Sequence, residues 1–343
     1  MTERAGHHHP ALFRSFANGY PTGVWGFCFP VHRMKLWLPL LFLATPAAAL
    51  DLAWPVACDL GQSCYIQQYP DHDPGPAAQD FTCGPLSYDG HDGTDIALPN
   101  RAAMEAGVDV LAAAPGTVRG LRDGIADFAP VVEGRECGNG VLIDHGKGWV
   151  TQYCHLRQGS VRVQVGQQVA AGQPLGQVGQ SGLAEFPHLH LSVRRGEAEV
   201  DPFAPDAMAC GVPPADDLWV TTPRYRPGGL LAAGFSAAVP EFDVIRQGLP
   251  TTPLAGDASG LVLWVHLFGA RSGDELIFTI TGPDGPFLAD TITLDRTQAQ
   301  SFRALGKRRT TPAWPTGTYQ GSVSLMRDGT RLDAIETSVT VLP

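Results

Sequence analysis

Hydrophobic and polar residues alternate in short runs through much of the chain, a pattern typical of strands with one buried face. Val161–Val165 alternates strictly, and residues 84–206 contain further short Val, Ile and Leu runs separated by glycine turns. The polar segment Asp144–Gly148, between two apolar runs, predicts a hairpin turn. We therefore expect residues 84–206 to form a mainly β domain with an antiparallel sheet.

A second group of strand-like segments follows a linker predicted over residues 207–227. These segments are Leu261–Val265, Leu276–Ile280, Thr291–Leu294 and Ser338–Val341, with turn sequences GPDG at 282–285 and RDG at 327–329. Short strands at regular spacing predict an immunoglobulin-like β-sandwich over residues 228–343. Residues 50–83 contain cysteines and prolines, and we expect them to form a lead-in to the first domain.

The N-terminal region contains a pattern of its own. From Met34 to Ala49 the chain has one lysine, a mostly apolar run of ten residues and a final Ala-Ala-Ala. This pattern indicates a secretory signal peptide, and the run is too short to span a membrane. We predict cleavage after Ala49 and a periplasmic or secreted protein without a transmembrane anchor. We interpret residues 1–33 as a non-native upstream extension. The alternatives to a cleaved signal peptide are a transmembrane anchor and a lipid anchor on Cys58.

Charge and cysteine content agree with export. The chain of 343 residues has a formal net charge of -10 and no evident basic patch, so nucleic acid is excluded as an expected partner. Six cysteines follow the predicted signal peptide, and an even number in an exported chain predicts disulfides, with 15 possible pairings. Our preferred pairs are Cys58–Cys64, Cys83–Cys210 and Cys137–Cys154. Only the last pair has a local argument, because the predicted hairpin brings its cysteines close if a bulge intervenes; the connectivity stays open.

Four of the seven histidines after residue 49 lie in three compact motifs. His91 precedes Asp95 by four residues, and His155 ends an apolar run. His188 and His190 are two residues apart, so on a strand both imidazoles point to the same face. Two imidazoles and one carboxylate make a zinc site that leaves one position open for water.

These motifs also carry a resemblance to a known family. In order along residues 88–203, they include HDGTDIALP, VLAAAPGTVRGL, GNGVLIDHGKGWVTQYCHL, VGQQVAAGQPLGQVGQSG, FPHLHLSVRR and VDPF. This third of the chain resembles the lysostaphin-type (LytM-domain) zinc metallopeptidases, which cut peptidoglycan peptides. The resemblance implies their antiparallel fold and one Zn²⁺ per chain, held by His91, Asp95 and His190. It implies catalytic roles for His155 and His188, with His188 as the base and His155 stabilising the oxyanion.

The resemblance implies an exported zinc metalloendopeptidase that hydrolyses peptide bonds in peptidoglycan cross-links through a zinc-activated water. Its partners are then peptidoglycan stem peptides, with a protein partner possible through the C-terminal domain. The alternative is a non-enzymatic LytM-type regulator that activates a cell-wall amidase. Such regulators have typically lost their zinc ligands, whereas this chain retains the full set. A bacteriolysin that targets foreign walls is a further alternative, which the acidic composition disfavours.

Several neighbouring residues invite simpler interpretations. Cys154 adjoins His155 on a strand, so we expect its side chain to face away from the metal and to form a disulfide. We expect Asp144 to cap the hairpin turn and His145 to be structural. The segment containing His72 and Asp73 is expected to be a solvated loop, although some relatives place a residue from such a segment on the zinc as a fourth ligand.

Overall fold

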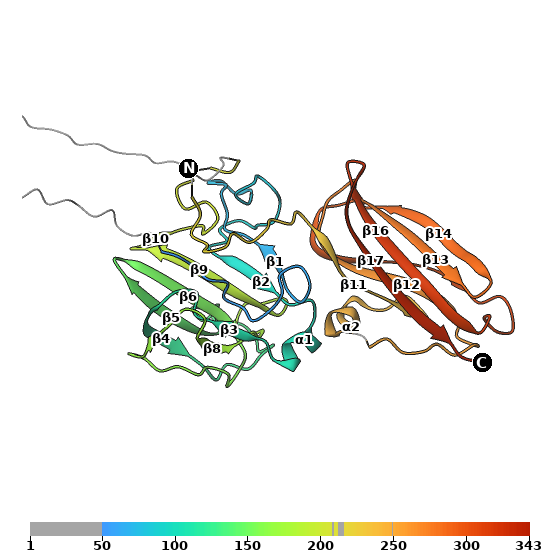
Figure 1. Cartoon of the computed structure of the whole chain (residues 1–343), viewed down its shortest axis with the longest axis horizontal. Helices are drawn as coiled ribbons and strands as arrows, with labels where there is room; N and C mark the ends of the chain where they lie inside the picture. The colour runs from blue at the N-terminus through green and yellow to red at the C-terminus, as the bar shows by residue number, and fades with distance from the viewer. Residues whose placement is uncertain (1–49, 208, 212–215, 249) are drawn as a thin grey trace, which may run out of the picture. The chain divides into compact units, whose positions relative to one another are not determined.

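The computed structural model describes residues 50–207, 209–211, 216–248 and 250–343 (Figure 1). The predicted signal peptide and the extension before it lie outside these residues. Hydrogen-bonded strands in the described sheets run antiparallel, so the mainly β fold predicted from the sequence is confirmed. Helices in this part of the chain are short: α1 (Arg101–Ala106) and α2 (Phe242–Gln247). No helix among the described residues is long and apolar enough to cross a membrane.

The first part of the structure is built on one large sheet. Its main path is β1 (Tyr65–Gln68), β2 (Thr94–Ala97), β9 (His188–Arg195), β6 (Trp149–Leu156), β5 (Asn139–Gly146), β4 (Gly116–Arg122) and β7 (Gln168–Val169). A short strand β10 (Ala198–Glu199) pairs with β9, and β3 (Asp109–Leu111) pairs with β8 (Pro174–Gln177) separately. Strands β5 and β6 form the predicted hairpin, with Lys147 and Gly148 at positive φ in its turn.

Alternation along β9 separates the core from the opposite face of the sheet. Leu189, Leu191 and Val193 are fully buried in the hydrophobic core beneath the sheet. Residues on the other face are polar, and they include His188 and His190. Because side chains of a strand alternate between its two faces, one strand both anchors the sheet and presents imidazoles.

Residues beyond 207 contribute to the first hydrophobic core. Leu218 and Trp219 belong to this core, and the Leu52 N–H donates to the Leu218 carbonyl at 2.7 Å. The Trp219 ring lies 5.3 Å from that of Phe203. A protein truncated before residue 218 would therefore expose part of the first core.

All three predicted disulfides are present. Cys58–Cys64 closes a short loop, Cys83–Cys210 joins positions 127 residues apart, and Cys137–Cys154 crosses the β5–β6 region. The last bridge requires the bulge that the sequence predicted, and the register between β5 and β6 shifts between Asn139 and Val141.

The second part is a β-sandwich, as predicted, and its two sheets contain three and four strands. One sheet contains β11 (Gly229–Ser236), β12 (Gly260–Ala270) and β15 (Gln298–Arg308). The other has the order β14 (Gly285–Thr293), β13 (Glu275–Gly282), β16 (Gly317–Arg327) and β17 (Thr330–Val341). Apolar residues of both sheets, such as Leu263 and Phe278, form one shared core. The chain crosses between the sheets after β12, β14 and β15, which is the connectivity of an immunoglobulin-like sandwich.

The sandwich also buries a histidine. His266 lies on β12 with 2% of its surface exposed, and its ring is 5.4 Å from that of Phe242. Burial lowers the pKa of His266 to about 4, because the apolar surroundings disfavour the imidazolium.

This buried histidine predicts acid sensitivity. In the unfolded chain His266 takes up a proton near pH 6.5, whereas the folded chain takes it up only near pH 4. The free energy of unfolding should therefore fall as the pH drops through this window, by about 2 kcal/mol between pH 7 and pH 5. His266→Leu should remove this share of the pH dependence in denaturant unfolding followed by circular dichroism. Equal pH dependence in both proteins would contradict the assignment.

Candidate metal centre

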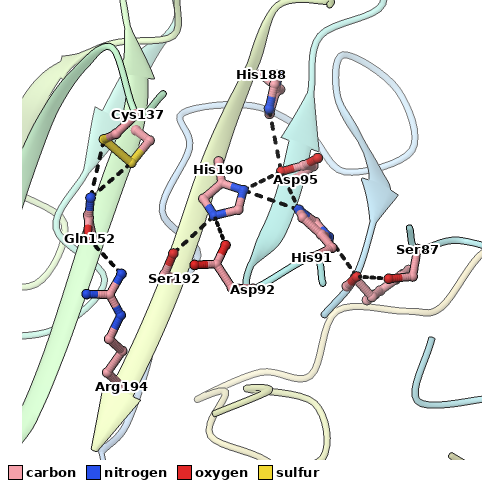
Figure 2. A network of polar contacts seen from close by, with 12 residues as sticks. Ser87, His91, Asp92, Asp95, Cys137, Gln152, His188, His190, Ser192 and Arg194 are labelled. Carbon is pink, nitrogen blue, oxygen red and sulfur yellow. Dashed lines mark hydrogen bonds and ion pairs between the residues drawn. A yellow bond between two sulfur atoms is a disulfide. The ribbon is translucent and has the colours of Figure 1, made fainter. Parts of the chain in front are cut away.

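Two neighbouring strands bring the predicted ligands together. Strands β2 and β9 pair Asp95 directly with His190, and cross-strand partners lie on the same face of a sheet. His91 lies four residues before Asp95, just ahead of β2. The Asp95 Oδ1 atom is 2.9 Å from His190 Nδ1 and 3.2 Å from His91 Nε2, and these nitrogens are 3.2 Å apart (Figure 2).

The three donor atoms fit a metal ion. The ligand atoms of His91, Asp95 and His190 lie within 4.8 Å of one another, and all three residues are buried. Tetrahedral zinc with bonds of about 2.1 Å separates its ligand atoms by about 3.4 Å, close to the spacing of these atoms. Two imidazole nitrogens and a carboxylate oxygen that face one point are typical zinc donors. Three protein donors leave one position of a tetrahedral zinc ion for a further ligand.

Outer hydrogen bonds orient both imidazoles. His91 Nδ1 donates to the Tyr69 carbonyl at 2.8 Å, since a carbonyl can only accept. His190 Nε2 lies 3.1 Å from Asp92 Oδ1 and 3.0 Å from Ser192 Oγ. Each ring therefore leaves its other nitrogen available for a metal ion beside Asp95, which is how outer partners commonly fix metal-binding histidines. Figure 2 shows these contacts.

The sequence interpretation assigned no role to Asp92 or Ser192. A signal existed for Ser192, which lies two residues after His190 and so shares its face of β9. Asp92 follows His91 directly in the HDGTD motif, but no periodic pattern indicates its direction.

The electrostatics of the centre favour positive charge. Burial opposes protonation of His190, but Asp92 and Asp95 outweigh it and raise the pKa of His190 to about 9. Burial would likewise raise the pKa of Asp95, but the imidazoles of His188 and His91 and its hydrogen bonds hold this pKa well below the usual range. The carboxylates thus stabilise a cation between them.

His155 and His188 lie beside this centre with their ring centroids 4.6 Å apart. His155 Nδ1 donates to the Ser181 carbonyl and His188 Nδ1 to the Phe186 carbonyl, each at 2.8 Å. Burial, with the neighbouring imidazoles, lowers the pKa of His155 to about 3, and burial also lowers the pKa of His188. Both rings are therefore neutral near pH 7, and each has an unprotonated Nε2 that can accept a proton.

The prediction that Cys154 faces away from the metal is wrong. Cys154 pairs with His190 across β6 and β9, and it lines the same cleft as His155 and His190. The reason is the backbone of His155, whose φ of 64° is left-handed and interrupts the alternation of the strand. The disulfide with Cys137 leaves Cys154 without a thiolate for a metal.

His72 is not in a solvated loop, contrary to expectation. Its side chain is 7% exposed, and its Nε2 lies 2.8 Å from Asp201 Oδ2. Among the described residues, the cluster of His, Asp, Glu or Cys side chains close enough to bind one metal ion consists of His91, Asp95 and His190. It does not include His72 or Asp73, so neither is a fourth ligand in this structure.

Two other interpretations are confirmed. Asp144 Oδ1 accepts a hydrogen bond from the Gly146 N–H at 2.8 Å, which caps the hairpin turn. His145 bonds the Pro115 carbonyl and the Thr151 hydroxyl, so it ties the hairpin to a neighbouring loop.

Comparison with known proteins identifies the class of the first domain. Residues 89–202 match the sequence profile of Peptidase family M23, which confirms the resemblance found in the sequence. The chain is 38% identical over 94 residues to the murein hydrolase activator EnvC of Escherichia coli, covering 27% of this chain and 22% of EnvC. It is 34% identical over 124 residues to the peptidoglycan DD-endopeptidase ShyA of Vibrio cholerae, covering 36% of this chain and 25% of ShyA.

Among solved structures, the catalytic domain of lysostaphin from Staphylococcus simulans aligns with 39% of this chain and 85% of its own, at 22% identity and a TM-score of 0.27. The matched region spans a quarter or less of the length of the two curated relatives named above. Residues 89–202 therefore form an M23-type domain, in a group that includes both peptidoglycan hydrolases and activators of hydrolases.

The geometry predicts how zinc binding depends on His190. His190→Ala removes one of three donors and should reduce the zinc content from about one per chain to near zero after dialysis. Elemental analysis by mass spectrometry measures this. His145→Ala, which changes a histidine outside the donor group, should keep its zinc. Retention of zinc by a folded His190→Ala protein would contradict this ligand set.

Proposed function

We propose that this protein is an exported zinc metalloendopeptidase that hydrolyses peptide bonds in peptidoglycan cross-links. The observation that carries the proposal is the convergence of His91 Nε2, Asp95 Oδ1 and His190 Nδ1 from the paired strands β2 and β9 and the segment just before β2. These residues would hold the zinc. The M23-type sequence of residues 89–202 supports the substrate class.

When bound, zinc supplies a Lewis acid that polarises a carbonyl and lowers the pKa of a coordinated water. His188 is suited to accept a proton at Nε2, because its Nδ1 proton is held by the Phe186 carbonyl. Its Nε2 lies 3.5 Å from Asp95 Oδ1, whose charge stabilises the imidazolium that forms. We therefore assign His188 as the general base that later protonates the leaving amine.

His155 forms the adjoining wall of the cleft and is the proposed partner of the substrate carbonyl. Its Nδ1 is held by the Ser181 carbonyl, so its Nε2 is the atom free to act. A pKa lowered to about 3 keeps this ring neutral until a proton reaches it from the reacting groups. His188 takes the first proton of the attacking water, and the second proton of the same water, taken up at His155 Nε2, would let this ring donate to the developing oxyanion.

Three disulfides among the described residues support export. Disulfides persist in oxidising compartments such as the periplasm and the extracellular space. This agrees with the signal peptide predicted from Met34 to Ala49, and we propose that the mature chain works outside the cytoplasm.

The alternative function is activation of a separate cell-wall amidase, and one matched relative is named a murein hydrolase activator. An activator needs no metal centre, so the buried donor set, with both imidazoles oriented by outer hydrogen bonds, favours the enzyme. The sandwich over residues 228–343 is proposed to bind a protein partner or to orient the peptidase.

Digestion of purified sacculi tests the proposed function. The zinc-loaded protein should release soluble fragments whose masses correspond to broken peptide bonds, and a zinc chelator should abolish their release. Mass spectrometry of the fragments identifies the bond. A folded, zinc-loaded protein that releases nothing alone, but accelerates an added amidase, would overturn the enzyme in favour of the activator.

The division of roles at the centre predicts a second result. His155→Ala should retain zinc but lose about a hundredfold or more in hydrolysis rate, the magnitude of one proton-transfer or oxyanion contribution. Zinc content and fragment release are measured on the same preparation. If His155→Ala instead loses its zinc, His155 is a ligand and the proposed roles are wrong.

A further inference from the structure

A cationic side chain lies in the cleft beside the metal centre and has no part in the mechanism above. This cleft has a volume of about 170 Å³. Its lining includes the ligand His190, the proposed catalytic residue His155 and, further along β9, Arg194. Arg194 shares its face of the strand with His190, because the two are four residues apart.

Arg194 is held in place from one side. Its Nη2 donates to Gln152 Oε1 at 3.0 Å, and Gln152 Nε2 lies 3.4 Å from each sulfur of the Cys137–Cys154 disulfide. Figure 2 shows Arg194, Gln152 and Cys137 as one connected series next to Ser192 and His190. A covalent cross-link thus anchors the amide that orients the guanidinium.

No carboxylate contacts Arg194 closely. Glu199 on β10 is its cross-strand partner. Burial raises the pKa of Glu199 and the guanidinium acts against this, while a hydrogen bond with His190 and the guanidinium both lower the pKa of Asp92. Among the described residues, neither carboxylate forms an ion pair with Arg194 within 4.0 Å. Two carboxylates line the same cleft, but Asp92 is engaged by His190 and Glu136 accepts from the Gly134 N–H. A guanidinium presents five N–H donors and matches a carboxylate in two-pronged geometry. The single contact with Gln152 leaves most of these donors for a ligand.

We propose that Arg194 binds a carboxylate of the substrate peptide and so selects acidic peptides over their amidated forms. This inference rests on the proposed peptidase function for its substrate. The Cα atoms of His190 and Arg194 are separated by about 13 Å of strand. An extended peptide covers about 3.3–3.6 Å per residue, so the bound carboxylate belongs to a residue within about four positions of the scissile bond.

Binding of one peptide in two forms tests the proposal. The probe is the synthetic stem peptide L-Ala-D-Glu-L-Lys-D-Ala-D-Ala, with its carboxylates either free or amidated, titrated by calorimetry into the zinc-loaded full chain. The free acid should bind about tenfold more tightly than the amide, the scale of a charge-assisted hydrogen bond. Arg194→Met should abolish this preference, while Arg194→Lys should keep only part of it, because lysine lacks the two-pronged geometry.

Two further variants control for structure. Arg195→Met removes the neighbouring positive charge, which lies over the Trp149 ring, and should leave the preference unchanged. Gln152→Glu keeps the size of the side chain but places a carboxylate against Arg194, so it should suppress the preference even if Arg194→Met does not fold. An unchanged preference in Arg194→Met or Gln152→Glu, or none in the wild type, overturns the proposal.

The same preparations separate this inference from the proposed function. Fragment release from sacculi is measured alongside peptide binding. A wild type that prefers the free acid but releases no fragments overturns the peptidase while supporting the carboxylate site. A wild type that releases fragments but binds both peptides equally overturns the site and supports the peptidase.

Discussion

The register of β2 against β9 is the constraint on which the rest of the site depends. It places Asp95 opposite His190 and leaves His188 opposite Ala97, on the same face of the sheet. A slip of one residue would turn Leu189 and Leu191, now fully buried, toward the cleft and would bury His190 in the core. The hydrophobic core thus fixes the position of the metal-binding atoms, because the leucines and histidines alternate on one strand.

A second constraint fixes His155. Its left-handed backbone is held where its N–H donates to the Cys137 carbonyl and its ring to the Ser181 carbonyl. Gly138 makes this approach possible, because a Cβ at this position would lie 2.4 Å from the Ser181 backbone. Gly138, the first glycine of the GNG sequence, therefore lets the segments containing Gly138 and Ser181 approach closely enough to hold His155.

Much of the fold and of the site could be predicted because it follows from local patterns. Strand alternation predicted the sheet and the shared direction of His188 and His190, and the HDGTD motif with its family resemblance indicated His91 and Asp95. The alternation was wrong at Val161–Val165, which lies between β6 and β7 and forms no strand. The β5–β6 hairpin and its turn cap at Asp144 follow from turn chemistry close in sequence.

What could not be predicted depends on backbone irregularity or on distant partners. The direction of Cys154 depends on the φ of the next residue, which no alternation rule anticipates. Burial of His72 depends on Asp201, a partner 129 residues away. The surroundings of Arg194 become visible only when β9 is paired with β6 and β10, which brings Gln152 and Glu199 beside it.

The separation of the ligands along the chain has a consequence for the stability of the fold. His91 and His190 are 99 residues apart, so an ion held by both acts as a removable cross-link that closes a long loop. Each tenfold rise in the free zinc concentration above the dissociation constant would then raise the free energy of unfolding by about 1.4 kcal/mol. Loss of a metal ion from this site would therefore also make the fold easier to unfold and to degrade.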